Sequence, residues 1–427
     1  MKLEAWLALL ETRHPVSIEL GLERCADVYM RLGAPRPAHK VFTVAGTNGK
    51  GSTVAYLSAL CGAMGLRHGT YTSPHIFRFN ERICIMGEVV DDETLVRAFG
   101  QVEAAREDVS LTYFEFTTLA GLLILQQAAL DCAVLEVGLG GRLDTVNLVD
   151  ADCAVITPIG LDHQEYLGPD LDSIAKEKAG IIRTGAPVVC SERQPPLPVL
   201  QAAMRLDAPL YRRGEDFDLD DDPSDNAELR FNCGEKSVSV PAPLMPGKYQ
   251  RDNLAAALCA FSMLYPDCFS RPRAIGQAIR TVRVPGRLQR VGSSPEILLD
   301  VGHNGLAAKA VAAYLACQEV NTLCVLAMLV DKPAEDVARA LHGVCQRWIC
   351  AGLPGGRGQT GAALAKRIEK VLPDADVESA VSMEDAMQAA VAAGGFDRIL
   401  VFGSFLTVAA ASNWIRDHGT AHFVSNC

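Results

Sequence analysis

A lysine set among glycines directly follows a short apolar segment, and together these residue types could bind phosphate. The apolar segment is Val41–Ala45, and the next segment, Gly46–Ser52, holds three glycines and Lys50. Glycines let the backbone turn so that its N–H groups converge on one anion, and the lysine adds positive charge. The strict pattern G-x-x-x-x-G-K-[ST] is not met, because Val44 stands at its first glycine position and Gly51 follows the lysine. These residues predict a loose phosphate-binding loop, with a plain glycine-rich turn as the alternative.

Three further polar residues, Ser73, Glu136 and His163, follow expected strands just as Gly46 does. In an open parallel sheet, ligands bind at the carboxyl edge of the strands. Glu136 lies in the apolar stretch Ala133–Val137, and a carboxylate there would be costly to bury unless it met a cation. Mg²⁺ takes oxygen ligands and is the expected partner, with an ion pair to a nearby lysine or arginine as the alternative. His163 could be a second metal ligand or a hydrogen-bonded structural histidine.

Lys178, Arg287 and Asp300 are charged residues whose positions allow two interpretations each. Lys178 stands near the end of an expected helix, where a cation is favourable, and spacing alone favours this role for an exposed side chain. Arg287 follows a Pro-Gly pair at an expected hinge, and Asp300 ends an expected strand. Either residue could form an interdomain ion pair or could contact a nucleotide.

Short apolar strands alternate with helical segments along the chain, which is the α/β pattern. Helical patterns are expected over Ser52–Leu60 and Phe116–Leu125. The further strands expected are His68–Thr72, Cys132–Val137, Cys153–Pro158 and Pro187–Cys190, then Ile297–Val301, Thr322–Val330, Trp348–Ala351 and Arg398–Phe402. The aspartate-rich stretch Gly214–Glu228 is predicted to be a solvated loop. The chain is expected to leave its first domain near Pro285-Gly286-Arg287.

Composition limits the classes of function. With 427 residues, the chain is long enough for about two or three domains. A net charge of −11 argues against general nucleic-acid binding, and no apolar stretch is long enough to span a membrane. The 14 cysteines form no C-x-x-C pair, so they are interpreted as buried thiols in a reducing compartment. Glu4 and Glu11 argue against a signal peptide, and a cytoplasmic protein is expected.

The motifs resemble, in order, those of the folylpolyglutamate synthase family within the Mur-ligase superfamily. The segments that carry the resemblance are Gly46–Ser52, Thr72–His75, Leu135–Asp144, Leu161–His163, Glu177–Ile181, Pro285–Arg287, Leu299–Asn304 and Phe402–Ser404. Ile18–Arg24 and Leu111–Phe116 are most similar to the bacterial bifunctional branch, dihydrofolate synthase/folylpolyglutamate synthase. One departure is Gly305, where the family usually has proline, which puts the rigidity of that turn in doubt.

The resemblance implies a fold and a set of site residues. It implies a P-loop-type parallel-sheet ATPase domain at 1–287, which binds ATP and pterin, and a smaller Rossmann-like α/β domain at 288–427, which binds glutamate. ATP would contact Thr47, Asn48, Gly49, Lys50, Gly51, Ser52, Asn253, Arg287 and Asp300. Pterin would contact Glu19, Leu20, Gly21, Leu22, Thr70, Tyr71, Thr72, Ser73, Thr112, Tyr113, Phe114, Glu115, Leu143, Asp144 and Thr145. Two Mg²⁺ sites would use Ser73, Glu136 and His163, and the catalytic set would be Lys50, Glu136, His163 and Lys178, the last as a carbamate.

The activity that the resemblance implies is ATP-dependent formation of an amide. L-glutamate would be joined to dihydropteroate, giving dihydrofolate, and to tetrahydrofolate mono- and polyglutamates, through an acyl phosphate. A ligase that adds amino acids to a peptidoglycan precursor is the alternative, although the phosphate loop begins too early for the extra N-terminal domain of such enzymes. A nucleotide-binding switch would not need the second domain and the metal set. The family resemblance favours a monomer.

Overall fold

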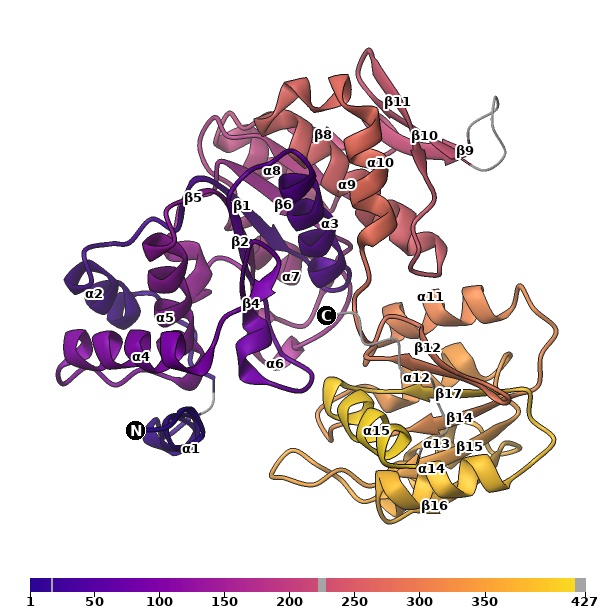
Figure 1. The fold of residues 1–427 in the computed structure, drawn as a ribbon. Helices are drawn as coiled ribbons and strands as arrows, with labels where there is room; N and C mark the ends of the chain where they lie inside the picture. The colour runs from indigo at the N-terminus through magenta and orange to yellow at the C-terminus, as the bar shows by residue number, and fades with distance from the viewer. Residues whose placement is uncertain (17, 222–227, 419–427) are drawn as a thin grey trace. The chain divides into compact units, whose positions relative to one another are not determined.

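The computed structural model describes residues 1–16, 18–221 and 228–418, and the chain divides into two compact units (Figure 1). The first unit comprises Met1–Leu244 and Gln250–Val282, and the second comprises Met245–Tyr249 and the chain from Arg283 onward. The functional boundary between residues 287 and 288 stays a prediction. In the part of the chain that the structure describes, none of the helices has the length and apolar character required to traverse a bilayer.

The first unit is built on an eight-stranded sheet with the order β4-β3-β2-β5-β1-β6-β7-β8. The strands are β1 (Ala38–Ala45), β2 (His68–Tyr71), β3 (Ile83–Ile85), β4 (Glu88–Val89), β5 (Leu130–Glu136), β6 (Cys153–Ile156), β7 (Val188–Cys190) and β8 (Leu210–Arg212). In this spatial order, the six strands β2, β5, β1, β6, β7 and β8 are parallel to one another. At the other edge, β3 pairs antiparallel with β2, and β4 pairs antiparallel with β3. The predicted parallel sheet is therefore confirmed. Val44 of β1 pairs with Glu136 of β5, so that carboxylate ends its strand beside the phosphate loop.

Helices cover both faces of this sheet, and the residues of β1 from Val41 to Ala45 are all buried for that reason. The elements are α1 (Leu3–Arg13), α2 (Glu23–Arg31), α3 (Lys50–Ala63), η1 (Phe79–Arg82), α4 (Asp92–Arg106), α5 (Tyr113–Gln127), η2 (Thr145–Leu148), α6 (Gln164–Leu167), α7 (Leu171–Ala179), α8 (Leu197–Arg205), α9 (Lys248–Leu264), η3 (Pro266–Ser270) and α10 (Pro272–Thr281). Val41 packs with side chains of α1, α2, α4 and α5, whereas the next residue, Phe42, stacks on Phe261 of α9 with ring centroids 6.4 Å apart. Successive residues of β1 thus face opposite layers.

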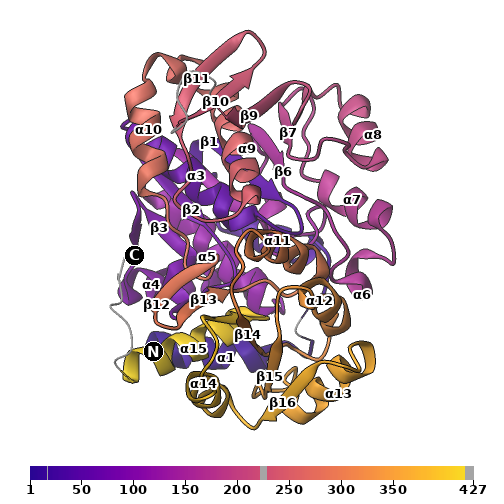
Figure 2. The same cartoon turned by 90° about the vertical axis from the view of Figure 1, so that its right-hand side faces the viewer.

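The prediction of a solvated loop over Gly214–Glu228 is wrong for its middle part. Residues Phe217–Asp221 form β9, the outer strand of a three-stranded antiparallel sheet with β10 (Glu228–Cys233) and β11 (Lys236–Pro241). Phe217 and Leu219 are buried, whereas Asp220 is exposed, which is the two-residue alternation of a strand with one wet face. Residues 222–227 of the expected loop lie outside the described residues. Of these strands, β11 lies next to α10 in both views (Figures 1 and 2).

The second unit is a six-stranded sheet with the order β12-β13-β17-β14-β15-β16, parallel except for β12 at one edge. Its strands are β12 (Gln289–Ser293), β13 (Glu296–Asp300), β14 (Thr322–Leu326), β15 (Arg347–Ala351), β16 (Asp376–Ala380) and β17 (Arg398–Phe402). Its helices are α11 (Gly305–Leu315), α12 (Ala334–Leu341), α13 (Gly361–Val371), α14 (Met383–Ala392) and α15 (Phe405–Asp417). Figure 2 shows α11, α12 and α13 on one side of the sheet and α14 and α15 on the other. The α/β class predicted for this part is confirmed.

One strand of the second unit is shorter than predicted. The strand expected over Thr322–Val330 ends at Leu326. Side chains take the carbonyls that follow, since Thr407 Oγ1 donates to the Ala327 oxygen at 2.6 Å and Gln359 Nε2 donates to the Met328 oxygen at 2.8 Å. Apolar composition continues beyond the strand, and Ala327 N still donates to the Phe402 oxygen of β17 at 3.2 Å, but the Ala327 and Met328 carbonyls accept from side chains instead of a neighbouring strand.

Candidate functional site

The phosphate loop runs between β1 and α3 in a backbone conformation that requires glycine at two positions. Gly46 has φ 150° and Gly49 has φ 90°. A Cβ on Gly46 would lie 1.8 Å from Thr157 Oγ1, and one on Gly49 would lie 2.4 Å from Asn253 Oδ1. Thr47 N donates to the Pro158 oxygen at 2.9 Å, which ties the loop to the chain after β6. The backbone of the predicted loop is therefore held in place by β1 and by contacts with Thr157, Pro158 and Asn253.

Asn253, a predicted ATP residue outside the loop, lies against Gly49 of this loop. It lies on α9 and is buried. Its Nδ2 donates to Gln250 Oε1 at 3.0 Å, which leaves the amide oxygen facing Gly49. Packing of α9 against the loop explains why residues about 200 positions apart in the chain meet.

Two lysines converge on one carbonyl of the loop. Lys50 Nζ donates to the Gly46 oxygen at 3.1 Å, and Lys178 Nζ donates to the same oxygen at 2.9 Å. Lys178 is 4% exposed, so the prediction of an exposed cation at the end of a helix is wrong. Burial, and after it the charge of Lys50, lower the pKa of Lys178 to about 7 against the opposing carboxylates of Asp162 and Asp144. The lysine lies at a helix end in sequence, but it points into the protein.

The glycine-rich segment after β5 packs directly on α7, the helix that carries Lys178. A Cβ on Gly141 would lie 2.7 Å from the Glu177 oxygen and 3.1 Å from Lys178 Cα. Arg142 N donates to the Glu177 oxygen at 2.7 Å, and the Arg142 and Glu177 side chains pair at 2.8 Å. The glycines are therefore needed for close approach, and they help to place Lys178 beside the phosphate loop.

Asp144, a predicted pterin residue, holds the segment after β5 in shape. Its carboxylate accepts hydrogen bonds from the backbone N–H groups of Leu139 at 2.8 Å and Val146 at 2.9 Å. Burial raises the pKa of Asp144 to about 6, while these backbone donors and Lys50 oppose the rise. Both oxygens thus have backbone partners.

Two of the three predicted metal ligands meet in the structure. Ser73 N donates to Glu136 Oε2 at 3.4 Å, and Glu136 is 6% exposed. His163 has φ 52° and ψ 38°, and its contacts include Asp162, whose Oδ1 lies 3.8 Å from Nε2. Among the described residues, no group of three or more His, Cys, Asp or Glu side chains gathers as a metal site. A buried carboxylate bonded to the backbone of a serine nevertheless suits a hard cation, because Glu136 and the Ser73 hydroxyl offer oxygen ligands of the kind that Mg²⁺ takes, with water completing the set.

The predicted pterin residues near the N-terminus are joined by an arginine that sequence reasoning missed. Arg24 pairs with Glu19 and also with Glu115, the latter at 2.9 Å. Glu115 accepts from Thr112 N at 2.8 Å and from Thr112 Oγ1 at 2.9 Å, in the capping box that starts α5. The segment before α2 is thereby tied to the start of α5.

Two aromatic residues among the predicted pterin contacts have different surroundings. Tyr71 is fully buried and its hydroxyl lies 2.8 Å from Thr118 Oγ1, so its side chain belongs to the core. Phe114 lies against Gly138, since a Cβ added to Gly138 would lie 2.4 Å from the Phe114 ring. The other predicted pterin residues are Leu20, Gly21, Leu22, Thr70, Thr72, Tyr113, Leu143 and Thr145, and the pterin-binding role of the whole predicted set stays a prediction.

Sequence reasoning also missed a pair that follows the Ser73-Pro74 segment. Arg82 is 7% exposed, and its Nε donates to His75 Nδ1 at 3.0 Å. Burial and the charge of Arg82 lower the pKa of His75 to about 4. An arginine between aromatic and apolar neighbours in the stretch Phe79–Ile85 was the signal in the sequence that could have identified it.

In the second unit, Asp300 anchors the turn that precedes β12. Its carboxylate accepts from Leu288 N at 2.9 Å and from Gly302 N at 2.8 Å. Burial raises the pKa of Asp300, and the charge of Arg287 and these donors oppose the rise. The Arg287 guanidinium lies over the Phe405 ring, 5.7 Å from its centroid. Asp300 is thus bonded to the backbone of its own unit and Arg287 packs on Phe405, while the nucleotide contact expected of both residues stays a prediction.

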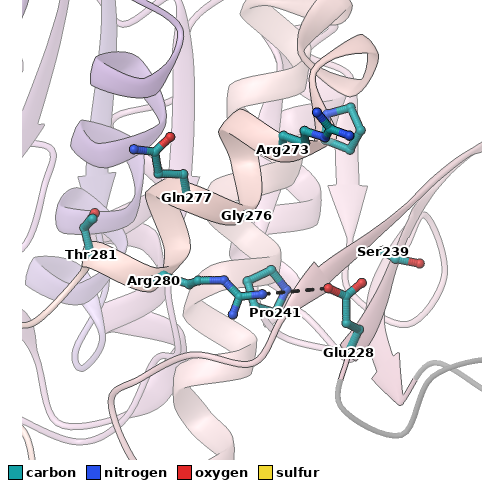
Figure 3. Close-up of a pocket in the computed structure, with 9 residues that line it drawn as sticks. Glu228, Ser239, Pro241, Arg273, Gly276, Gln277, Arg280 and Thr281 are labelled. Carbon is teal, nitrogen blue, oxygen red and sulfur yellow. Dashed lines mark ion pairs between the residues drawn. The ribbon is translucent and has the colours of Figure 1, made fainter.

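A pocket of about 580 Å³ lies elsewhere in the first unit, between α10 and the sheet of β10 and β11 (Figure 3). Arg280 of α10 points toward Glu228 of β10, with 3.9 Å between the charged groups. None of the residues predicted to contact ATP, metal or pterin, all of which the structure describes, lines this pocket.

Two family models match the chain. The model described as the Mur ligase middle domain matches residues 44–261, and the one described as the Mur ligase glutamate ligase domain matches residues 286–405. The dihydrofolate synthase/folylpolyglutamate synthase of Escherichia coli (strain K12) is 40% identical over 411 residues, which cover 95% of this chain and 94% of that protein. The protein of the same name from Haemophilus influenzae is 36% identical over 428 residues, covering 95% and 96%.

Solved structures agree with this match along nearly the whole chain. E. coli FolC in complex with DHPP and ADP has a TM-score of 0.90 and 38% identity, covering 98% of this chain and 99% of that one. The Yersinia pestis bifunctional folylpolyglutamate synthase/dihydrofolate synthase complexed with AMPPNP and Mn ion has a TM-score of 0.88 and 39% identity, covering 97% and 98%.

Proposed function

The chain belongs to the dihydrofolate synthase/folylpolyglutamate synthase family of the Mur ligases, and from this membership we propose that it joins L-glutamate to dihydropteroate and to reduced folates, using ATP as co-substrate. The observation that carries the proposal is the phosphate loop with Lys50, Lys178 and Asn253 around it, in a chain that matches these ligases over 95% of its length. The relatives reported are folate ligases, so the alternative of a peptidoglycan-precursor ligase is not supported.

The reaction needs an activated carboxyl group, because a free carboxylate has no adequate leaving group. Transfer of the γ-phosphoryl group of ATP to the carboxylate gives an acyl phosphate and ADP. The amine of L-glutamate then attacks the acyl carbon and expels phosphate, which leaves an amide. The loop residues Thr47, Asn48, Gly49, Gly51 and Ser52 would hold the ATP phosphates, and the first turn of α3 would direct backbone N–H groups at them, because these groups have no partner within the helix. Lys50, now bonded to the Gly46 and Thr47 oxygens, would turn to the transferred phosphoryl group.

Ser73, Glu136 and His163 would hold Mg²⁺, with two sites in the active complex. A bound divalent cation neutralises charge on the phosphate and acyl oxygens. The pairing of Ser73 with Glu136 and the burial of Glu136 support this assignment.

Lys178 would react with CO₂ to form a carbamate and act as an anionic ligand beside the metal. Carbamylation needs a neutral amine, and burial together with Lys50 holds the pKa of Lys178 at about 7, where a large share is neutral at physiological pH. This reverses the interpretation that sequence spacing favoured.

The remaining assignments rest on the family resemblance. Asn253, Arg287 and Asp300 would contact ATP, domain 1–287 would bind ATP and pterin, and domain 288–427 would bind glutamate. A monomer in the cytoplasm is part of the same proposal.

Product formation tests the function directly. The purified protein is incubated with ATP, Mg²⁺ and L-glutamate, with dihydropteroate and tetrahydrofolate in separate reactions, and products are identified by mass spectrometry. Dihydrofolate and tetrahydrofolate diglutamate are expected. A parallel reaction with a nucleotide-sugar peptide should give no product, and amino-acid addition to that peptide instead of the pterins would contradict the proposal.

A further inference from the structure

Arg82 is a buried cation that no acidic side chain neutralises. Its guanidinium lies over the rings of Phe79 and Tyr113, 5.2 and 5.7 Å from their centroids, and its Nε donates to His75. Among the residues that the structure describes, no aspartate or glutamate pairs with it. The other buried arginine of the described chain, Arg398, pairs with a glutamate at 2.6 Å. A buried charge without a counter-ion is costly, and ring contacts offset only part of that cost.

The segment around Arg82 is fixed before any ligand binds. Thr72 N donates to the Arg82 oxygen at 2.8 Å. The Glu81 carboxylate accepts from three successive backbone N–H groups, those of Ile76 at 2.8 Å, Phe77 at 3.0 Å and Arg78 at 2.6 Å. Asn80 Nδ2 donates to the Val90 oxygen at 2.9 Å. The backbone that carries Arg82 is thus held in place, and the bond to His75 orients the guanidinium, which lowers the entropy lost when it binds an anion.

The surroundings of Arg82 identify the anion. Tyr113, which stacks on the guanidinium, and Thr72, which bonds its backbone, are both predicted pterin contacts. Ser73 follows Thr72 and reaches Glu136, at the predicted metal site. A pteroyl substrate carries its negative charge at the benzoate end, which must approach that site for activation. The positive charge of Arg82 therefore lies where the charged end of the substrate is expected.

We propose that the Arg82 guanidinium binds a carboxylate of the pteroyl substrate, with His75 as a positioning residue that holds the guanidinium through Nε. This inference rests on the proposed function. The planar guanidinium matches a carboxylate with two parallel N–H donors, which an ammonium cannot do. The carboxylate is either the one that becomes the amide or, in a folate, the α-carboxylate of its glutamate. Both groups are carboxylates. Dihydropteroate has only the reacting carboxylate, whereas a folate has both.

A binding cycle that removes charge from the protein and from the ligand separately tests this assignment. Calorimetry measures the affinities of wild-type protein and Arg82→Met for dihydropteroate and for its carboxamide. The methionine stem can lie between the two rings without a charge. We expect the wild-type protein to prefer the carboxylate by about tenfold or more, as charge-assisted hydrogen bonds commonly give, and the variant to show a preference below about twofold.

The matched control is Arg78→Met, which removes the same charge from an exposed side chain in the same segment. Arg78 has a side-chain exposure of 70% and pairs with Asp92 at 3.3 Å. This variant should keep the wild-type preference. Thermal denaturation of each variant shows whether it is folded. If Arg82→Met does not fold, Arg82→Lys keeps the stem and charge but loses the planar donor pair, and its preference should fall about threefold.

The same cycle with tetrahydrofolate and its α-carboxamide distinguishes the two carboxylates. Loss of preference with dihydropteroate assigns Arg82 to the reacting carboxylate, and loss with the tetrahydrofolate pair alone assigns it to the α-carboxylate. A wild-type preference retained in the folded Arg82→Met or Arg82→Lys variant for both pairs would overturn the inference and leave Arg82 as a packing residue. Product formation by the wild-type protein is measured separately, so a failure of the proposed function is recognised as such.

Discussion

Lys178 of the first unit and Asp300 of the second are both 4% exposed and carry opposite charges, and the protein satisfies them in different ways. Asp300 accepts from two backbone N–H groups, which suits a carboxylate that holds a turn. Lys178 has one carbonyl, the oxygen of Gly46, which it shares with a second lysine. Burial opposes the charge of both groups, but only Lys178 also faces a like charge that opposes it further.

The difference shows how a structural charge can be told from a reactive one. A charged residue whose hydrogen bonds are complete within the fold stabilises the fold, so removing it should mainly lower the free energy of unfolding. A buried group that the fold leaves poorly compensated is maintained at a cost, which is common at functional sites. By this criterion we expect the edge of the first sheet around Lys178 to be the chemical site and the turn around Asp300 to be a supporting region of the second unit. The predictions below test that division.

The largest effect is expected from Glu136→Gln in the first unit. The change keeps the shape but removes the charge that a Mg²⁺ site requires, so turnover should fall by about 10²–10³. Steady-state rates at saturating Mg²⁺ measure it, and thermal denaturation should show an intact fold. Activity above about a tenth of the wild-type value would remove Glu136 from the metal site.

Lys178→Ala should also lose most of its turnover, and a small carboxylate should restore part of it. If the working form of Lys178 is a carbamate, then acetate or formate can occupy the space and supply an anionic oxygen. Activity is measured with increasing acetate, and Lys176→Ala, an exposed lysine two residues earlier on α7, is the control. Mass spectrometry in bicarbonate should show the added CO₂ on wild-type protein. Rescue by chloride at equal ionic strength would point to simple charge screening instead.

The sequence was sufficient for the architecture and for the phosphate loop because both depend on local pattern. Strand-to-loop transitions such as Val41–Ser52 combine apolar runs with glycines, and the glycine positions at 46 and 49 are set by backbone geometry. The burial of Lys178 could not be predicted from local pattern. It depends on Gly141 and Gly180 letting two segments approach closely, and spacing along a helix carries no information about that contact.

Other features were missed because their partners lie far apart in the chain or because composition misleads. Arg24 and Glu115 are separated by 91 positions, and their pairing exists only once α2 and α5 are packed together. The strand Phe217–Asp221 alternates two buried residues with aspartates, so its composition resembles a loop although its period is that of a strand.

Asp300→Ala tests the supporting region. Two buried backbone N–H groups would lose their acceptor, so the free energy of unfolding should fall by about 1–3 kcal/mol. Asp300→Asn keeps one acceptor oxygen and should lose less. Calorimetric melting measures stability, and the Michaelis constant for ATP is measured on the same samples. An unchanged constant for ATP would contradict the proposed nucleotide contact, and unchanged melting would contradict the anchoring role.

The stability of the wild-type protein should rise with pH relative to Lys178→Met. The pKa of Lys178 is lowered from 10.5 to about 7 in the folded state, so the unfolded chain binds more protons between these values. The cost of burying the cation is therefore complete below about pH 7 and disappears as the pH rises toward 10.5. Between pH 7 and 9 the wild-type protein should gain up to about 1.4 kcal/mol per pH unit on the variant. Denaturant unfolding in bicarbonate-free buffer measures this, and a constant difference would show that Lys178 titrates normally.

The smallest effect is expected from Gly305→Pro, at the first residue of α11 in the supporting region. Proline is favoured at this helix position, and the preceding residue, Asn304, already has the extended φ of −142° and ψ of 166° that proline requires before it. The Asn304 side chain caps the helix through Ala307 N at 2.9 Å, so the turn is held without proline. The restricted unfolded chain should add about 0.4–1 kcal/mol of stability.

Gly305→Ala is the matched control for this last change, because it introduces the same Cβ without the ring. That atom would lie 3.2 Å from Asp336 Cβ, which is attached to the backbone of α12, so this helix would have to shift by a few tenths of an ångström. If proline stabilises more than alanine in calorimetric melting, the ring's effect on the unfolded chain accounts for the gain. If both variants are destabilised to the same extent, the contact with Asp336 dominates. Glycine at position 305 is then needed for packing in the second unit, and it does not merely make the turn less rigid.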